Sequence, residues 1–437
     1  MLKKIEEIFS IPELRKRIFM TLFLLAIFRI GAHIPTPGVD GQALAMLASS
    51  ASGNLLGFFD MFTGGAFLKL TVFAMGVMPY ISASIIMELL AVVIPTLAEL
   101  KKRGSEGRAQ ITKYTRYLTV VICIIQGVAI AISVQNMQID GSTSVVFIEG
   151  WKFLFIATLT LTTGTMFLVW LGEKITSFGV GNGMSLIIMA GIISAFPKAV
   201  IDSYQLLAAG QLQIINALIA VVIMASAFIA IVFMEISQRR LPIQYVRKGN
   251  AGGTVQSGNS YLPLRLNPAG VIPVIFASTL ISLPATLATF TTNETVQQIN
   301  RFFLPDNFIY YILEVTLIIF FTYFYTSIIF NPADIADNIN KSGGVMPGRR
   351  PGAETANYID YVLTRLTFVG ALYLALVSVL PQFLIQGFSL PFYFGGTSLL
   401  IVVGVALDVI QKVEAHLVTH NYDGFLKKGR IKGRNWS

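Results

Sequence analysis

Long apolar runs alternate with short polar segments along the whole chain. A helix needs about 20 apolar residues, rising 1.5 Å each, to cross the hydrocarbon core of a bilayer. Ten runs approach this length and are predicted to span the membrane, at 18–34, 71–95, 117–134, 152–171, 183–196, 213–234, 269–290, 308–330, 362–380 and 396–411. The pattern predicts an all-α polytopic membrane protein. The fifth predicted span is short, and we expect it to end at Pro197.

Two of these spans contain the same interrupted motif. GVMPYISAS (76–84) lies in the second span and GVIPVIFAS (270–278) in the seventh, with six of nine positions identical. Gly and Pro interruptions at corresponding places in two halves of a membrane protein point to a transport path. Because the copies are five spans apart, two five-span units in tandem would insert with opposite orientations. We therefore predict two inverted halves, 1–205 with spans one to five and 206–437 with spans six to ten.

The basic residues indicate the orientation of the chain. If the N-terminus is cytoplasmic, 27 of the 32 lysines and arginines fall in segments on the cytoplasmic side. Such asymmetry predicts that both termini are cytoplasmic. The largest segments on that side are the loops 235–266 and 331–365 and the basic tail 412–437.

The overall composition agrees with this class of protein. Hydrophobic residues make up 54% of the chain and charged residues only 13%, compared with about 25% charged residues in ordinary globular proteins. The single cysteine, Cys123, lies within an apolar run and is expected to pack there, since no intramolecular disulfide is possible. The first apolar run has no small-residue cleavage site beside it, so we do not expect a cleaved signal peptide.

The sequence contains no recognisable catalytic or cofactor motif. There is no GxxxxGK[ST] loop, no HExxH and no GxSxG. His416 and His420 have the i, i+4 spacing of a metal pair, but with no cysteine nearby they are better interpreted as a solvated helix end. We predict neither an enzyme nor a bound metal or cofactor, so the energy for transport must come from elsewhere.

Ionisable residues inside the predicted spans are few. Glu88, Glu314 and Asp408 are the candidates, with Arg29 near the end of a span, and intramembrane charges are functional candidates by default. We favour positions near the cytoplasmic ends for Glu88 and Asp408. An ion-coupled carrier would be expected to line its central site with several such groups. Their scarcity argues weakly against an inverted-repeat secondary transporter of a small solute, which remains the alternative.

A shorter apolar segment, LLGFFDMFTGGAFL (55–68), lies between the first two spans. It carries Asp60 and the Gly64–Gly65 pair, and it is too short to cross the bilayer. A re-entrant or interfacial piece and an ordinary external loop helix both remain open on these residues alone.

Six motifs together resemble the SecY family, the central subunits of the bacterial protein-conducting channel. They are MPYISASIIMELL (78–90), PTLAELKK (95–102), GEKITSFGVGNGMSLIIMAGI (172–192), NPAGVIPVIFAS (267–278), MPGRRPG (346–352) and PFYFGGTSLLIVV (391–403). The resemblance covers essentially all ten spans. It implies a channel for unfolded polypeptides, formed by one chain whose halves form a clamshell hinged between spans five and six. A lateral gate between spans two and seven would release signal sequences and membrane helices into lipid.

The resemblance also implies which residues close and open the channel. The pore ring would consist of Val77, Ile81, Met184, Ile188, Ile275 and Ile401. Narrow apolar constrictions dewet and so exclude ions; valine and methionine replace the isoleucine frequent in the family at two positions, which would soften the seal. The repeated motif would place Gly76, Pro79, Ser84, Gly270, Pro273 and Ser278 at the lateral gate. Gly and Pro would allow each gate helix to bend there.

The segment 55–68 would be the plug, a short helix that blocks the outer funnel of the idle channel. Its residues are Leu55, Leu56, Phe58, Phe59, Met61, Phe62, Gly64, Gly65 and Phe67.

The resemblance further implies partners and a bacterial plasma membrane location. The partners would be small SecE-like and SecG-like membrane subunits, together with a SecA-like motor ATPase or a translating ribosome. The residues expected to bind the motor or ribosome are Arg239, Arg240, Arg247, Lys248, Arg349 and Arg350. The loop 331–365 carries four bases and four acids, so a topology signal alone explains its arginines poorly. Its Gly- and Pro-rich middle favours a projecting turn. The tip of the loop 235–266 is less positive than in some relatives.

Overall fold

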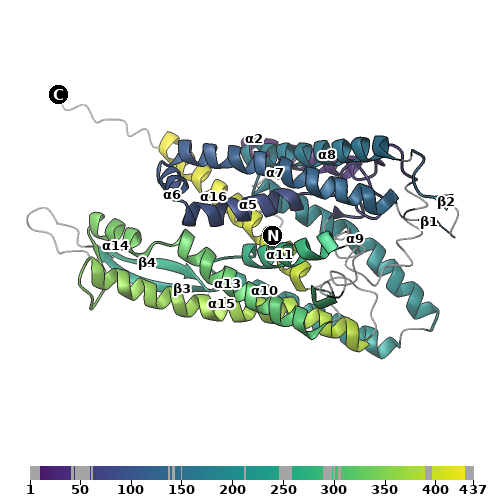
Figure 1. Ribbon diagram of the computed structural model, residues 1–437. Helices are drawn as coiled ribbons and strands as arrows, with labels where there is room; N and C mark the ends of the chain where they lie inside the picture. The colour runs from purple at the N-terminus through teal and green to yellow at the C-terminus, as the bar shows by residue number, and fades with distance from the viewer. Residues whose placement is uncertain are drawn as a thin grey trace, which may run out of the picture. The chain divides into compact units, whose positions relative to one another are not determined.

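The computed structural model describes most of the chain (Figure 1). The described residues are 10–40, 44, 60, 63–135, 138–139, 143–148, 150–210, 213–245, 258–288, 298, 301–303, 307–388 and 396–428. They form two compact units, Met1–Pro197 with Val405–Ser437 and Lys198–Gly404.

Ten helices overlap the ten predicted spans. They are α2 (Pro12–Gly31), α5 (Met78–Val93), α7 (Ser105–Gln135), α8 (Trp151–Phe178), α9 (Gly183–Ala208), α10 (Ile214–Ile236), α11 (Ile272–Ala288), α13 (Phe308–Ile329), α15 (Ala353–Phe388) and α16 (Gly396–Lys428). Among the described residues, seven helical stretches are long and apolar enough to cross a membrane by themselves, and α5 with α6 (Pro95–Lys102), bent by 101°, gives an eighth. The helix α2 carries four cations and α11 has only 17 residues, so both fall outside these limits.

The Gly-Pro motif marks the start of a helix in both units. The second span was predicted from residue 71, but Val72–Val77 is a series of turns and α5 begins at Met78. Gly76 has φ +57° and Pro79 is the second helical residue; Gly270 has φ +63° and Pro273 is the second residue of α11. The motif at which we predicted that each gate helix can bend therefore lies at the helix start, where proline costs no ladder hydrogen bond.

Other predicted boundaries differ as well. The fifth span does not end at Pro197, since α9 continues through it to Ala208. The ninth begins earlier than predicted, because α15 starts at Ala353. The segment 331–365 is consequently mostly helical, with α14 (Pro332–Lys341) preceding the turn that carries its arginines.

In the first unit, α7 and α8 lie side by side (Figure 1). Small residues permit this close approach, as is common between membrane helices. An added Cβ on Gly127 of α7 would lie 3.3 Å from Thr158 of α8. Gly164 of α8 faces the turns before α5, because its added Cβ would lie 1.9 Å from the Val72 carbonyl oxygen. The backbone that leads into α5 therefore rests directly on α8.

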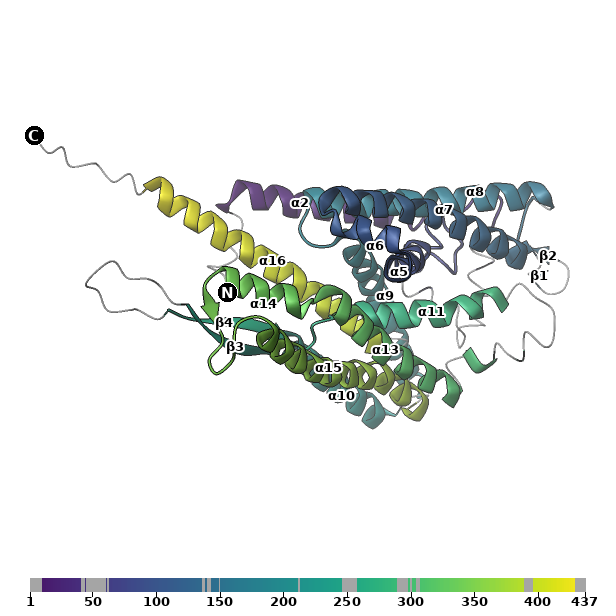
Figure 2. The ribbon, with the colours of Figure 1, turned by 60° about the vertical axis from the view of Figure 1, so that its left-hand side comes forward.

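The second unit contains a small mixed structure, which we call the sheet body. It comprises strands β3 (Gln238–Tyr245), β4 (Gly258–Arg265) and β5 (Gly344–Val345), together with α14 and the first three turns of α15. The antiparallel strands have the order β4-β3-β5, and Figure 2 shows α14 and the start of α15 beside them. Its apolar core consists of Leu241, Ile243, Leu264, Ala336, Ile339, Met346, Ile359 and Leu363.

Candidate functional site

Four of the six predicted pore-ring residues lie in the first unit. Val77 is the N-cap of α5 and Ile81 lies in its first turn; both are buried, as is Ile188 of α9. Met184 is half-buried, and its thioether lies against Gly172 of α8, where an added Cβ would be 2.7 Å from the sulfur. Each helical pair of the ring has the i, i+4 spacing of one face.

The other two ring residues, Ile275 of α11 and Ile401 of α16, lie in the second unit and are also buried. The ring assignment stays a prediction.

The predicted gate residues occupy equivalent local positions in the two units. Gly76 and Gly270 adopt left-handed backbone, and the prolines follow three residues later. Ser278 is buried and its hydroxyl donates to the Ile275 carbonyl at 3.0 Å, whereas Ser84 is half-buried. The same helix-start geometry in both copies supports a structural repeat and not a coincidence of apolar composition.

The predicted plug falls partly outside the described residues. Leu55, Leu56, Phe58, Phe59, Met61 and Phe62 lie outside them, whereas Gly64, Gly65 and Phe67 are described. The Gly64 carbonyl accepts a hydrogen bond from Arg29 Nη1 of α2 at 2.7 Å and lies 3.5 Å from Ser194 Oγ of α9.

We call Arg29, Gly64 and Ser194 the Gly64 seat. Gly64 has φ +69°, and its added Cβ would lie 2.6 Å from the Ser194 oxygen, so only glycine fits there without displacement. Beside it, the Asp60 carboxylate accepts from the Leu68 amide at 2.9 Å. The end of the predicted plug segment is therefore an ordered turn whose backbone contacts α2 and α9.

The sheet body brings the two predicted docking loops together. Arg239 and Arg240 are exposed on β3, while Arg247 and Lys248 lie outside the described residues. Residues 344–345 pair with the end of β3. Because of this pairing, the turn that contains Arg349 and Arg350 belongs to the sheet body as well.

This turn is fixed on the start of α15. The Arg349 guanidinium lies 5.0 Å above the Tyr358 ring. The Arg350 amide donates to the Glu354 carboxylate at 3.1 Å, and its carbonyl accepts from Thr355 Oγ1 at 2.9 Å. The Arg350 side chain is exposed, so an ordered backbone presents an accessible guanidinium.

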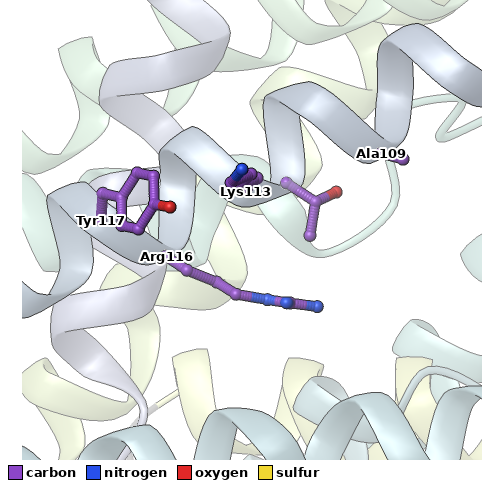
Figure 3. A pocket seen from close by; sticks show the side chains of 5 residues that line it. Ala109, Lys113, Arg116 and Tyr117 are labelled. Atoms are coloured by element: carbon purple, nitrogen blue, oxygen red, sulfur yellow. The ribbon is translucent and has the colours of Figure 1, made fainter.

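A cavity on α7 contains two cationic side chains, Lys113 and Arg116 (Figure 3). It is lined by Ala109, Thr112, Lys113, Arg116 and Tyr117. Arg116 donates two hydrogen bonds to the Glu173 carboxylate of α8, at 2.8 and 2.7 Å. This ion pair joins α7 to α8 and occupies the guanidinium fork. Across the described part of the chain, no group of three or more His, Cys, Asp or Glu residues could hold a metal ion.

Sequence reasoning missed two buried polar pairs in the second unit. Glu314 of α13 is 1% exposed and hydrogen-bonds Ser378 of α15 at 2.5 Å. Glu235, in the last turn of α10, accepts from Asn267 at 2.8 Å. An acid at the boundary of an apolar run was the available signal for Glu235, but Asn267 lies 32 positions further along the chain, so local sequence did not reveal the pairing. Asp408 of α16, in contrast, forms a partly exposed ion pair with Lys412 at 2.8 Å.

Comparisons with known proteins agree over nearly the full length. A sequence profile of the SecY family matches residues 71–410. The protein translocase subunit SecY of Escherichia coli K12 is 44% identical over 428 residues, covering 97% of this chain and 96% of that protein. The same subunit of Aquifex aeolicus is 42% identical over 426 residues, covering 97% and 99%.

Solved structures show the same fold. A structure described as that of a protein conducting channel aligns with TM-score 0.65 and 17% identity, covering 96% of this chain and 95% of that one. Sec61 in the canine ribosome-channel complex aligns with TM-score 0.60 and 16% identity, covering 96% and 95%. The predicted fold class, ten transmembrane helices in two inverted five-helix halves of the SecY type, is confirmed, and the chain belongs to the SecY family.

Proposed function

We propose that this chain is the central subunit of a protein-conducting channel, which passes unfolded polypeptides across the bacterial plasma membrane. The observation that carries this proposal is the 44% identity with a protein translocase subunit over 97% of the chain. A small-solute transporter of inverted-repeat type would not account for that similarity. The channel role requires no catalytic set, metal or cofactor in this chain.

In this proposal the idle channel is closed by the apolar ring and the plug. Its supports are the burial of Val77, Ile81 and Ile188 within the first unit and the Gly64 seat at the end of the plug segment. One structural neighbour is described as showing that the plug domain of SecY stabilises the closed state and maintains a membrane seal. Membrane helices and signal sequences would leave toward lipid between α5 and α11, the two helices that begin with the repeated motif.

The proposed topology places both termini and the sheet body on the cytoplasmic side, with the halves divided at residues 205 and 206. The support is the distribution of 27 of 32 lysines and arginines. The exposed arginines of the sheet body then face the cytoplasm. Guanidinium forks bind carboxylates and phosphates with two parallel hydrogen bonds, which suits either an acidic protein surface or ribosomal RNA.

The proposed partners follow from the same family membership. They are SecE-like and SecG-like membrane subunits, a SecA-like motor and the ribosome. Sec61, a structural neighbour, is described in a ribosome-channel complex, which supports the ribosome as a partner here.

Reconstitution tests the proposal directly. The channel with its SecE-like and SecG-like subunits is placed in liposomes, and the motor and a signal-bearing precursor are added outside. ATP-dependent protection of the precursor from protease is expected. Absence of protection, together with uptake of a small solute along an ion gradient, would establish the alternative.

A further inference from the structure

A buried amide connects the end of one membrane helix to the start of another in the second unit. Asn267 is 1% exposed and lies between β4 and α11. Its Nδ2 donates to Glu235 Oε1 of α10 at 2.8 Å and to the Gly270 carbonyl at 2.9 Å. One side chain therefore fixes both the last turn of α10 and the left-handed turn from which α11 begins.

The helix α15 completes this arrangement. An added Cβ on Gly370 would lie 3.5 Å from Asn267 Cα and 3.1 Å from the Leu266 carbonyl oxygen. Tyr373 follows Gly370 three residues later on the same side of the helix. We call Glu235, Asn267 and Tyr373 the polar joint.

Two polar atoms of the joint lack a hydrogen-bond partner in the described part of the chain. Asn267 Oδ1 and the Tyr373 hydroxyl are buried and have no hydrogen-bond partner among the described residues. Buried polar groups without partners are costly, and polar groups at membrane depth commonly mark function.

The joint lies directly beneath the sheet body. Strand β3 begins at Gln238, just after α10, and β4 ends at Arg265, just before Asn267. The Leu266 amide donates to the Ser237 carbonyl at 3.0 Å, which closes the base of the β3–β4 hairpin. Figure 2 shows the two strands continuing from α10 toward α14.

The sheet body has its own apolar core, and packed cores switch between discrete arrangements and do not deform smoothly. A displacement of the body as one piece would reach α11 through residues 266–271. Gly270 there has φ +63° and nothing would crowd a Cβ at that position, so the Asn267 side chain restrains the turn through its bond to the Gly270 carbonyl.

We propose that Asn267 is a positioning residue that makes the orientation of α11 depend on the position of the sheet body. A partner that docks on the exposed arginines of the body thereby acts on the start of a gate helix. The proposal rests on the proposed function for the identity of the gate and of the docking partner. Glu235 holds Asn267 in place through the 2.8 Å hydrogen bond.

The test measures binding of the motor to the channel separately from export through the channel. Asn267→Asp places two carboxylates against each other and removes the donor to Gly270. Export driven by the motor is expected to fall about tenfold, the size expected for loss of one buried hydrogen bond to a charged group. Affinity of the motor for the membranes should stay within about twofold, so the ATP hydrolysed per exported chain rises about tenfold.

A compensating pair distinguishes positioning from general stability. In Glu235→Gln with Asn267→Asp, the glutamine amide donates to the aspartate and restores the bond to α10 in reverse, but the Gly270 carbonyl still lacks its donor. This double variant is expected to accumulate as the original channel does and to export about tenfold less, as Asn267→Asp does. Ser378→Ala, which removes a different buried bond to a carboxylate in the same unit, is the matched control and should export normally.

Membrane abundance and assembly with the small subunits are measured for every variant. If Asn267→Asp does not accumulate, Glu235→Ala removes the acceptor but leaves the Gly270 contact, and should reduce export about fivefold. Equal loss in Ser378→Ala, full recovery of export in the double variant, or motor affinity that falls with export would overturn the proposal. Failure of the unmodified channel to export would refute the proposed function instead, whereas normal export by both joint variants would refute only the role of the joint.

Discussion

The Gly64 seat offers a direct test of how the idle channel is kept closed. Arg29→Met removes the Nη1 donor that lies 2.7 Å from the Gly64 carbonyl and retains most of the length of the side chain. The remaining contact from Ser194 is 3.5 Å long and therefore weak. The end of the plug segment would lose its only short hydrogen bond to α2 among the described residues.

The magnitude follows from the chemistry of the bond. A hydrogen bond from a charged donor contributes about 1.5–3 kcal/mol, and Arg29 is half-buried, so the lower end of that range applies. Since about 1.4 kcal/mol is a factor of ten in an equilibrium, the population with the plug displaced should rise about tenfold. Arg29→Lys retains a donor and should raise it by less than about threefold.

Ion conductance of the idle channel in planar bilayers reports this population. The matched control is Arg17→Met, in the same helix, because the ion pair of Arg17 within the described part of the chain is a partly exposed one with Glu13 at 3.7 Å. Equal ion conductance of the Arg29→Met and Arg17→Met channels in the absence of a precursor would refute the role of the Arg29–Gly64 hydrogen bond in keeping the channel closed.

Three further predictions concern the ring, the gate and the docking turn. Replacing the four isoleucines of the ring with asparagine should raise the ion conductance of the idle channel, because wetting a narrow apolar pore removes its barrier to ions. Unchanged conductance in planar bilayers would contradict the assignment of these residues to the pore ring. Cysteines on α5 and α11 near Ser84 and Ser278 should form a disulfide, which requires Cα atoms within about 7 Å, and should block export; normal export by crosslinked channels would place the gate elsewhere. Arg350→Glu should insert and assemble but lose most motor-driven export, with only part restored by Arg350→Lys; original rates at equal abundance would exclude this turn as the docking site.

The predicted spans could be found from the sequence because apolar runs of about 20 residues rarely occur outside membrane helices. Their ends were harder to predict. An apolar run does not reveal that Val72–Val77 is a set of turns, although the proline at position 79 was a usable signal, since proline favours the first turn of a helix. The continuation of α9 through Pro197 ran against the usual signal, because proline commonly ends or kinks a helix.

The sheet body was the largest omission. Both long strands contain a proline, Pro242 in β3 and Pro263 in β4, and proline within a run argues against a central strand. The strands also carry exposed arginines, which suggested a basic loop. Leu241 and Ile243 form the apolar core of the sheet body with residues of α14 and α15. Contacts of this kind, between segments far apart in the chain, cannot be predicted from local sequence.

The two copies of the repeated motif differ in what holds them. The left-handed turn at Gly76 lies against the plug segment, because an added Cβ there would be 3.0 Å from the Thr63 side chain. The turn at Gly270 is held instead by Asn267, at the base of the sheet body. Identical helix starts are thus attached to different structures, one to the segment proposed to seal the channel and one to the body proposed to receive its partner. The two gate helices thus keep the same local backbone but contact different segments. This difference would allow one helix to respond to the plug segment and the other to a partner bound on the sheet body.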